Sequence, residues 1–135
     1  MHDDLDVYKK SIDLVVGIYK VTKSFPKDEK FGLVNQMRRA AVSIPSNISE
    51  GYGRKSLNEL IRFLYISKGS LNELETQITV SERLCLINEN DSKILKIKIT
   101  EISKMLCSLI NSIDKKRKKI LGEKNILKEE MEIYG

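Results

Sequence analysis

The chain has 135 residues, of which 41% are hydrophobic and 32% are charged, while glycine (7) and proline (2) are scarce. This length suits one compact domain, which disfavours a two-domain enzyme, and the composition excludes collagen-like, low-complexity and largely disordered proteins. The formal net charge of +5 is concentrated in residues 31–70 (+4) and 91–121 (+6), whereas residues 71–90 (−3) and 122–135 (−2) are acidic, so two basic segments are available to a polyanion.

An amphipathic helix is predicted near the start of the chain. Positions that recur there at spacings of three and four predict one buried face, made of Leu5, Tyr8, Ile12, Val15, Tyr19 and Thr22. Phe25 ends the helix because Pro26 disfavours helical backbone in the residue before it. The acidic N-terminus does not resemble a signal peptide, and no apolar run is long enough to span a bilayer, so we expect a cytoplasmic protein without membrane partners.

A second amphipathic helix follows, with a proline in its interior. Its predicted buried face consists of Val34, Met37, Ala41, Ile44 and Ile48. Pro45 lacks the amide N–H that would bond the Ala41 carbonyl, so the helix either kinks or breaks. A kink is the better prediction because the apolar spacing continues in phase across the proline. Gly51 and Gly53 are predicted to end the helix in positive-φ conformations.

The third helix is predicted to be long and to begin at a capping box, in which the Ser56 hydroxyl and the Glu59 carboxylate satisfy free amides. Its buried face follows a heptad-like alternation through Leu60, Leu64, Ser67, Leu71, Leu74, Ile78, Ser81 and Cys85. Gly69 lies in the helix interior, where glycine costs about 1 kcal/mol relative to alanine. We therefore expect Gly69 to allow the close approach of a neighbouring helix.

The fourth helix is predicted to follow a polar turn at residues 88–91. Its buried face is Leu95, Ile99, Ile102, Leu106, Leu109, Ile113 and Ile120. Gly122 is predicted to end this helix, which leaves residues 123–135 as a C-terminal tail or a helix extension. Four amphipathic helices without an alternating strand pattern predict an all-α fold, an antiparallel up-down-up-down four-helix bundle over residues 1–122 with a Pro-kinked second helix.

Residues that support catalysis or metal binding are scarce. His2 is the only histidine, so a central histidine base is missing, and no glutamate is followed three residues later by the histidine that a di-iron bundle needs. Cys85 and Cys107 lack CxxC spacing, which disfavours a disulfide or a zinc site, and we expect both to be buried thiols. The sequence predicts a protein that is not an enzyme and has no metal or cofactor.

Two groups of basic residues are candidate nucleic-acid-binding sites. One is the run Lys115, Lys116, Arg117, Lys118 and Lys119, and the other comprises Arg38, Arg39, Arg54, Lys55 and Arg62. Both groups also have a structural interpretation. The run could complement the dipole of the fourth helix, and the two adjacent arginines could be buried partners of a carboxylate from Glu50, Glu73 or Glu75.

Several motifs together resemble the four-helix bundle protein family. They are Phe31-Gly32-Leu33, Gln36-x-Arg38-Arg39-Ala40, Ser43-Ile44-Pro45-x-Asn47-Ile48-x-Glu50-Gly51, Arg62-Phe63-Leu64-Tyr65-Ile66 and Gly69-Ser70-Leu71-x-Glu73-Leu74-Glu75. The resemblance covers about residues 5–120. This family includes proteins encoded in intervening sequences of bacterial large-subunit ribosomal RNA, and a similar relative is the accessory variability determinant of diversity-generating retroelements.

The resemblance implies an antiparallel four-helix subunit, a ring-like pentamer with a positively charged surface and, for the retroelement relative, a reverse transcriptase and nucleic acid as partners. The residues also predict self-association, because Leu14, Ile18, Phe63 and Ile66 lie off the predicted buried faces. We therefore expect a self-assembling helical protein that binds RNA or DNA through phosphates. The alternative is an oligomeric scaffold or adaptor for a protein partner such as a reverse transcriptase.

Overall fold

The computed structural model describes residues 5–134, and every regular element among them is helical. The elements in chain order are α1 (Asp6–Thr22), the 3-10 turn η2 (Lys27–Glu29), the π-helical turn η3 (Lys30–Val34), α2 (Asn35–Tyr52), α3 (Leu57–Arg83) and α4 (Glu89–Tyr134). The prediction of an all-α four-helix bundle is confirmed.

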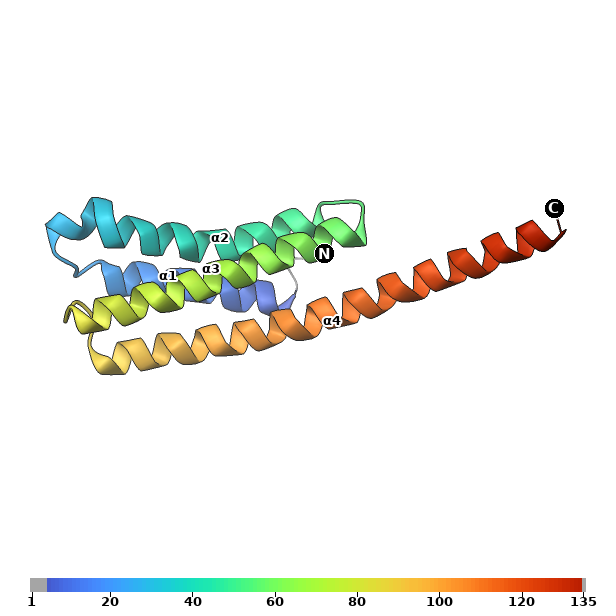
Figure 1. Ribbon diagram of the computed structural model, residues 1–135. Helices are drawn as coiled ribbons and strands as arrows, with labels where there is room; N and C mark the ends of the chain where they lie inside the picture. The colour runs from blue at the N-terminus through green and yellow to red at the C-terminus, as the bar shows by residue number, and fades with distance from the viewer. Residues whose placement is uncertain (1–4, 135) are drawn as a thin grey trace.

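The four long helices pack into one bundle, from which α4 projects. Helix α2 packs against α1 and α3, and α4 packs against α3 and α1. Figure 1 shows the ribbon turning back at each connection, so that successive helices run in alternating directions. With 46 residues, α4 is about 69 Å long at the usual helical rise. Its last turns extend alone beyond the bundle in Figure 1.

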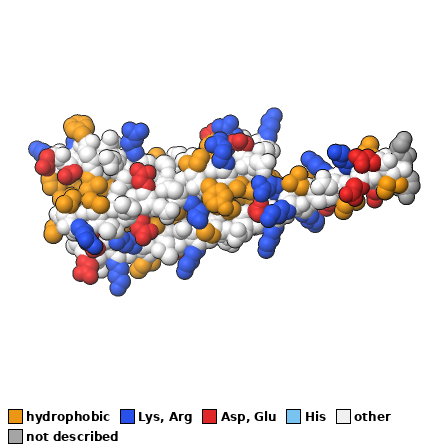
Figure 2. All heavy atoms as spheres, in the orientation of Figure 1, with side chains coloured by type: hydrophobic (Ala, Val, Ile, Leu, Met, Phe, Trp, Pro, Cys, Tyr) orange, Lys and Arg blue, Asp and Glu red, His pale blue; other side chains and the backbone are white. Residues whose placement is uncertain are grey.

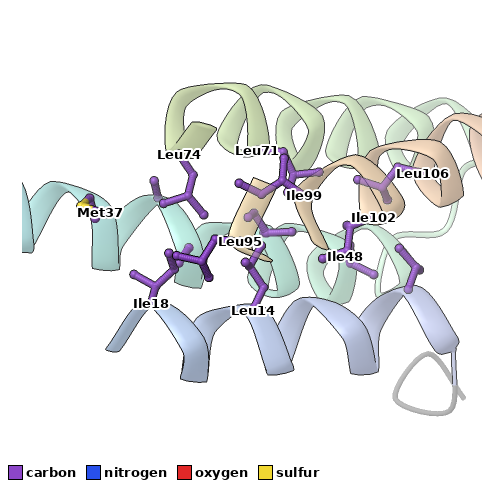
Figure 3. Packing of buried hydrophobic residues seen from close by; sticks show 14 of the residues in the cluster. Leu14, Ile18, Met37, Ile48, Leu71, Leu74, Leu95, Ile99, Ile102 and Leu106 are labelled. Atoms are coloured by element: carbon purple, nitrogen blue, oxygen red, sulfur yellow. The ribbon is translucent and has the colours of Figure 1, made fainter. Parts of the chain in front are cut away.

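The core lies along the centre of the bundle, where large aliphatic side chains from all four helices meet. Figure 3 shows labelled side chains from all four helices gathered in the core, among them Leu14 and Ile18 of α1, Ile48 of α2, Leu71 and Leu74 of α3, and Leu95, Ile99 and Ile102 of α4. The predicted buried face of α2 is buried, as is that of α3 up to Ser81 and that of α4 at Leu95, Ile99, Ile102, Leu106 and Ile113. On α4 the prediction is wrong at Ile120, which is 37% exposed, and Leu109 is only partly buried. These three faces could be predicted from spacing because most apolar side chains of each helix lie on one side.

The predicted buried face of α1 is wrong at its centre, although Thr22 is buried as predicted. Leu14 and Ile18 are 0% exposed, whereas Ile12 and Tyr19, which were predicted to be buried, are 39% and 43% exposed. Helix α1 carries bulky apolar residues on both sides, so spacing alone could not decide which side faces the core. Two of the residues assigned to self-association, Leu14 and Ile18, are thus core residues, and Phe63 is also buried.

Helix α2 continues through Pro45 as one helix, so no break occurs there. The kink at this proline stays a prediction. The helix ends at Tyr52, where the sequence predicted an end, but neither Gly51 nor Gly53 has a positive φ. A Cβ added at Gly51 would lie 3.0 Å from the Cβ of Phe63 and 3.1 Å from Leu60 Cδ1. A side chain at position 51 would require Phe63 and Leu60 to shift by a few tenths of an ångström, so glycine permits the close approach of α3 there.

Helix α3 begins at the predicted Ser56 cap, but the Glu59 carboxylate pairs with Arg62, and the glycine and the cysteine differ from the prediction. The Ser56 hydroxyl accepts a hydrogen bond from the Glu59 amide at 3.1 Å, which caps the first turn. A Cβ at Gly69 would meet nothing within 4 Å, so no helix of this chain approaches it closely. Cys85 is exposed, just beyond the end of α3, in a positive-φ conformation (59°), and Cys107 is half-buried. The prediction of two buried thiols is therefore wrong, because Cys85 belongs to the turn and not to the helix.

Helix α4 does not end at Gly122. It runs to Tyr134, and a Cβ at Gly122 would meet nothing within 4 Å. The predicted helix end is wrong because a glycine stops a helix when its backbone turns left-handed, and no glycine of the described chain does so.

Candidate nucleic-acid interface

Eight of the ten predicted site residues gather at one end of the bundle, where α2 ends, α3 begins and α4 leaves the other helices. The contact that links these elements is a hydrogen bond of 2.8 Å, donated by Arg117 Nη1 to Asn58 Oδ1. We call this group the basic cluster; it consists of Arg54, Lys55, Arg62, Lys115, Lys116, Arg117, Lys118 and Lys119. Figure 2 shows several lysine and arginine side chains at the point where α4 departs from the bundle.

Two arginines of the basic cluster share an aromatic support. The guanidinium carbons of Arg54 and Arg62 lie 5.1 and 4.4 Å from the centre of the Phe63 ring. Arg54 also pairs with Glu50 at 2.7 Å and Arg62 with Glu59 at 2.9 Å. The hydrogen bond from Arg62 lowers the pKa of the Glu59 carboxyl. The ring and the carboxylates hold both guanidinium groups in place and leave them accessible to solvent.

Asp114 organises the start of the basic run. Its carboxylate accepts a hydrogen bond from Arg117 Nη2, one turn further along α4, and pairs with Lys118 at 3.2 Å. The bond from Lys118 is the main cause of the lowered pKa of Asp114, and Arg117 adds to it. Asp114 thus holds two cations, and one of them, Arg117, also contacts Asn58 on α3.

The carboxylates neutralise the basic cluster only in part. Within residues 5–134, Glu50, Glu59 and Asp114 are the carboxylates that form ion pairs with its eight cationic side chains. Lys55, Lys115, Lys116 and Lys119 are exposed and have no such pair within this range. An excess of positive charge therefore faces solvent at this end of the molecule, as phosphate attraction requires.

Arg38 and Arg39 lie apart from the basic cluster. They belong to the first turns of α2, and the 13 helical steps from Arg39 to Tyr52, where α2 ends, correspond to about 20 Å. Arg38 donates from Nε to Thr22 Oγ1 at 3.0 Å and from Nη2 to the Tyr19 carbonyl at 3.3 Å, while its guanidinium stacks 4.4 Å from the Tyr19 ring centre. Arg38 thus joins α2 to α1, and its partners are not the glutamates considered above. Arg39 is exposed.

Three residues that shape the basic cluster were missed from the sequence. Asp114 could have been found, because a carboxylate three and four residues before Arg117 and Lys118 is a known source of helix ion pairs. Phe63 and Asn58 could not, because their contacts with the cluster depend on how α2, α3 and α4 pack. Phe63 was assigned to self-association, but its ring supports Arg54 and Arg62.

Other kinds of site have little support in the described residues. No group of three potential metal-ligating side chains occurs among residues 5–134, and within the same range no helix is long and apolar enough to cross a membrane. His2, the only histidine, lies outside the described residues.

Comparisons with known proteins agree with the fold. Residues 3–108 match the sequence model of a family described as 23S rRNA-intervening sequence protein. A solved structure from Bacteroides thetaiotaomicron VPI-5482, described as a protein of unknown function from the S23 ribosomal protein family, is similar with a TM-score of 0.70 and 29% sequence identity. The similarity covers 77% of this chain and 97% of that chain. No curated protein matches the sequence.

Proposed function

Because the chain belongs to the 23S rRNA-intervening sequence protein family, we propose that it is a non-catalytic, self-associating cytoplasmic protein that binds RNA through its basic cluster. The observation that carries this proposal is the excess of exposed positive charge at the end of the bundle. Unpaired lysines surround arginines that are already held in position by Phe63 and Asp114.

The cluster supports binding to phosphates with little reading of base sequence. Its lysines and arginines are donors that contact phosphate oxygens, which gives affinity without sequence information. Phe63 is buried beneath Arg54 and Arg62, so its ring cannot stack on a base. The same surface therefore suits DNA as well, and RNA is favoured by the family to which the chain belongs.

The test is the salt dependence of RNA binding, measured by fluorescence anisotropy over a series of salt concentrations. We expect replacement of Lys115, Lys116 and Lys119 by glutamine to lower the affinity and to reduce the slope of log K against log salt. The slope should fall by up to about 0.7 for each phosphate of a single strand that the variant no longer neutralises. Arg117 and Lys118 stay in place, so the packing of α4 on α3 is kept.

The matched control replaces Lys20, Lys23 and Lys27 by glutamine, which removes the same charge from exposed positions at the other end of the bundle. Its slope should stay close to that of the unchanged protein. Equal slopes for the two triple variants, or the lack of RNA and DNA binding at low salt, would contradict the proposal.

Self-association is supported by an exposed apolar groove between α1 and α2. Ile12, Val15 and Val42 line this groove, and Ile12 and Val42 are exposed large hydrophobic residues. Such a groove suits a contact with another copy, and the pentamer implied by the family resemblance is one arrangement that would use it. The groove also suits the rival function of a scaffold or adaptor. Co-purification with one protein that persists after nuclease treatment would favour that rival.

A further inference from the structure

An exposed aromatic ring lies beside the basic cluster on α3. The Tyr65 side chain is 56% exposed, whereas the Phe63 ring beneath Arg62 is buried. Tyr65 follows Arg62 by three residues and Asn58 by seven, and both spacings place side chains on the same side of a helix. Asn58 accepts the hydrogen bond from Arg117. Tyr65 therefore lies on the side of α3 that carries Arg62 and the contact with the basic run of α4.

Lys68 adds a cation one turn further along α3. Its Nζ lies 6.0 Å from the centre of the Tyr65 ring, which is within the range of a cation–π contact. Lys68 forms no ion pair with any residue in the range 5–134. Positive charge thus lies on both sides of Tyr65 along the helix, at Arg62 before it and at Lys68 after it.

The bundle itself does not use the Tyr65 ring. Tyr8 and Tyr52 are partly buried and pack against the core, whereas Tyr65 is not among the residues that do so. Within the described part of the chain, its polar contact is the one with Lys68. Internal packing therefore gives no reason for a large ring at this position.

A ring between cations is suited to hold an unpaired base of a nucleic acid. Every base has a flat face that stacks on an aromatic side chain, while the cations contact the phosphates before and after it. The bases of a duplex already stack on one another and are not available to a ring on the protein surface. Stacking thus distinguishes a single strand from a duplex, which phosphate contacts alone do poorly.

We propose that Tyr65 stacks on an unpaired base of the RNA whose phosphates bind the basic cluster, with Arg62 and Lys68 contacting the phosphates on either side of that base. This inference rests on the proposed RNA binding and adds to it a preference for single-stranded RNA. Because stacking tolerates any base, the preference concerns the form of the strand and not its sequence.

Fluorescence anisotropy tests the stacking with two labelled probes, an oligouridylate, which lacks stable base pairs, and an RNA duplex of the same length. Tyr65→Ala should lower the affinity for the single strand by roughly 5- to 150-fold, the usual effect of one stacked base. Its affinity for the duplex should not change. Tyr65→Phe keeps the ring and should keep the affinity of the unchanged protein for both probes.

Phe31→Ala is the matched control, because it removes an aromatic ring that is 86% exposed from the other end of the bundle. Its affinity for both probes should equal that of the unchanged protein. Tyr65→Ala should also leave the slope of log K against log salt unchanged, since no charge is removed. The slope therefore separates the stacking from the phosphate contacts.

Two results would overturn the proposal. Tyr65→Ala might bind the single strand as tightly as the unchanged protein while the steep salt dependence persists, which would remove the stacking and keep the proposed RNA binding. An equal loss of affinity for the single strand and the duplex would show that the ring does not act on an unpaired base. The lack of RNA binding at low salt would contradict both proposals.

A second measurement detects the stack directly. The fluorescence of 2-aminopurine, placed within the oligouridylate, falls when this base stacks on a ring. At protein concentrations that saturate the strand, we expect quenching by the unchanged protein and by Tyr65→Phe, and weaker quenching by Tyr65→Ala. Equal quenching by all three proteins would contradict the proposal.

Discussion

At the scale of single residues, two glycines have different structural roles. Gly51 lies against the backbone and side chain of Leu60 and against Phe63, whereas Gly69 has nothing within 4 Å of the position of a Cβ. Gly51 therefore controls how closely α2 approaches α3. Within the subunit, Gly69 contributes only the low helix propensity of glycine.

We predict opposite effects of alanine at these two glycines. Gly51→Ala should destabilise the fold by about 1–3 kcal/mol, because its Cβ would force Leu60 and Phe63 to move. Gly69→Ala is the matched control and should stabilise it by about 0.5–1 kcal/mol through helix propensity. Urea unfolding followed by circular dichroism gives both values. A neutral Gly51→Ala would show that α2 and α3 can separate without cost.

At the scale of helices, polar contacts join α2 to α3 beside the proline. The buried Ser67 hydroxyl donates to the Ile44 carbonyl at 2.9 Å, and the Ser43 and Ser70 hydroxyls contact each other nearby. These contacts lie next to Pro45, where α2 lacks an amide donor. The two helices are therefore joined by hydrogen bonds beside the position where α2 lacks one backbone hydrogen bond.

We predict that Ser67→Ala lowers the free energy of unfolding by about 1 kcal/mol, the usual value of one buried hydrogen bond. Ser108→Ala, at an exposed position of α4, is the control and should have almost no effect. Thermal unfolding of the two variants under one condition makes the comparison. Equal stability of the two would mean that the Ser67 bond adds nothing to the α2–α3 contact.

At the scale of the whole molecule, the basic cluster and the apolar groove between α1 and α2 occupy different parts of the surface. The basic cluster lies at one end of the bundle, and the apolar groove lies along α1 and α2. This separation allows subunits to associate through the groove without covering the cations that bind RNA. It also allows subunit association and RNA binding to be removed separately by different substitutions.

We predict that Val42→Glu lowers the mass measured by light scattering, because Val42 lines the groove. Val80→Glu is the matched control, since Val80 on α3 is 43% exposed against 40% for Val42 and lies outside the groove. The control should keep the mass of the unchanged protein. An unchanged mass for Val42→Glu would show that the groove is not the contact between subunits.

By itself, the sequence determined the helical class, the approximate limits of the first three helices, the buried face of α2 and most of the buried faces of α3 and α4. It could do so because covalent spacing alone places residues three and four apart on the same side of a helix. The Ser56 cap was predictable for the same reason, since all its atoms lie within one turn. The ion pairs of Asp114 were equally local, although they were overlooked.

Only the tertiary structure decided which side of α1 faces the core, which basic residues lie together and which glycine permits a close approach. Each of these depends on how one helix is rotated and placed against another, and the spacing along a single helix contains no such information. Arg38 and Arg54 are close to opposite ends of α2, yet one holds α1 in place and the other joins a cluster with α3 and α4. The candidate site is therefore a property of the packing, because residues more than fifty positions apart, such as Asn58 and Arg117, meet there.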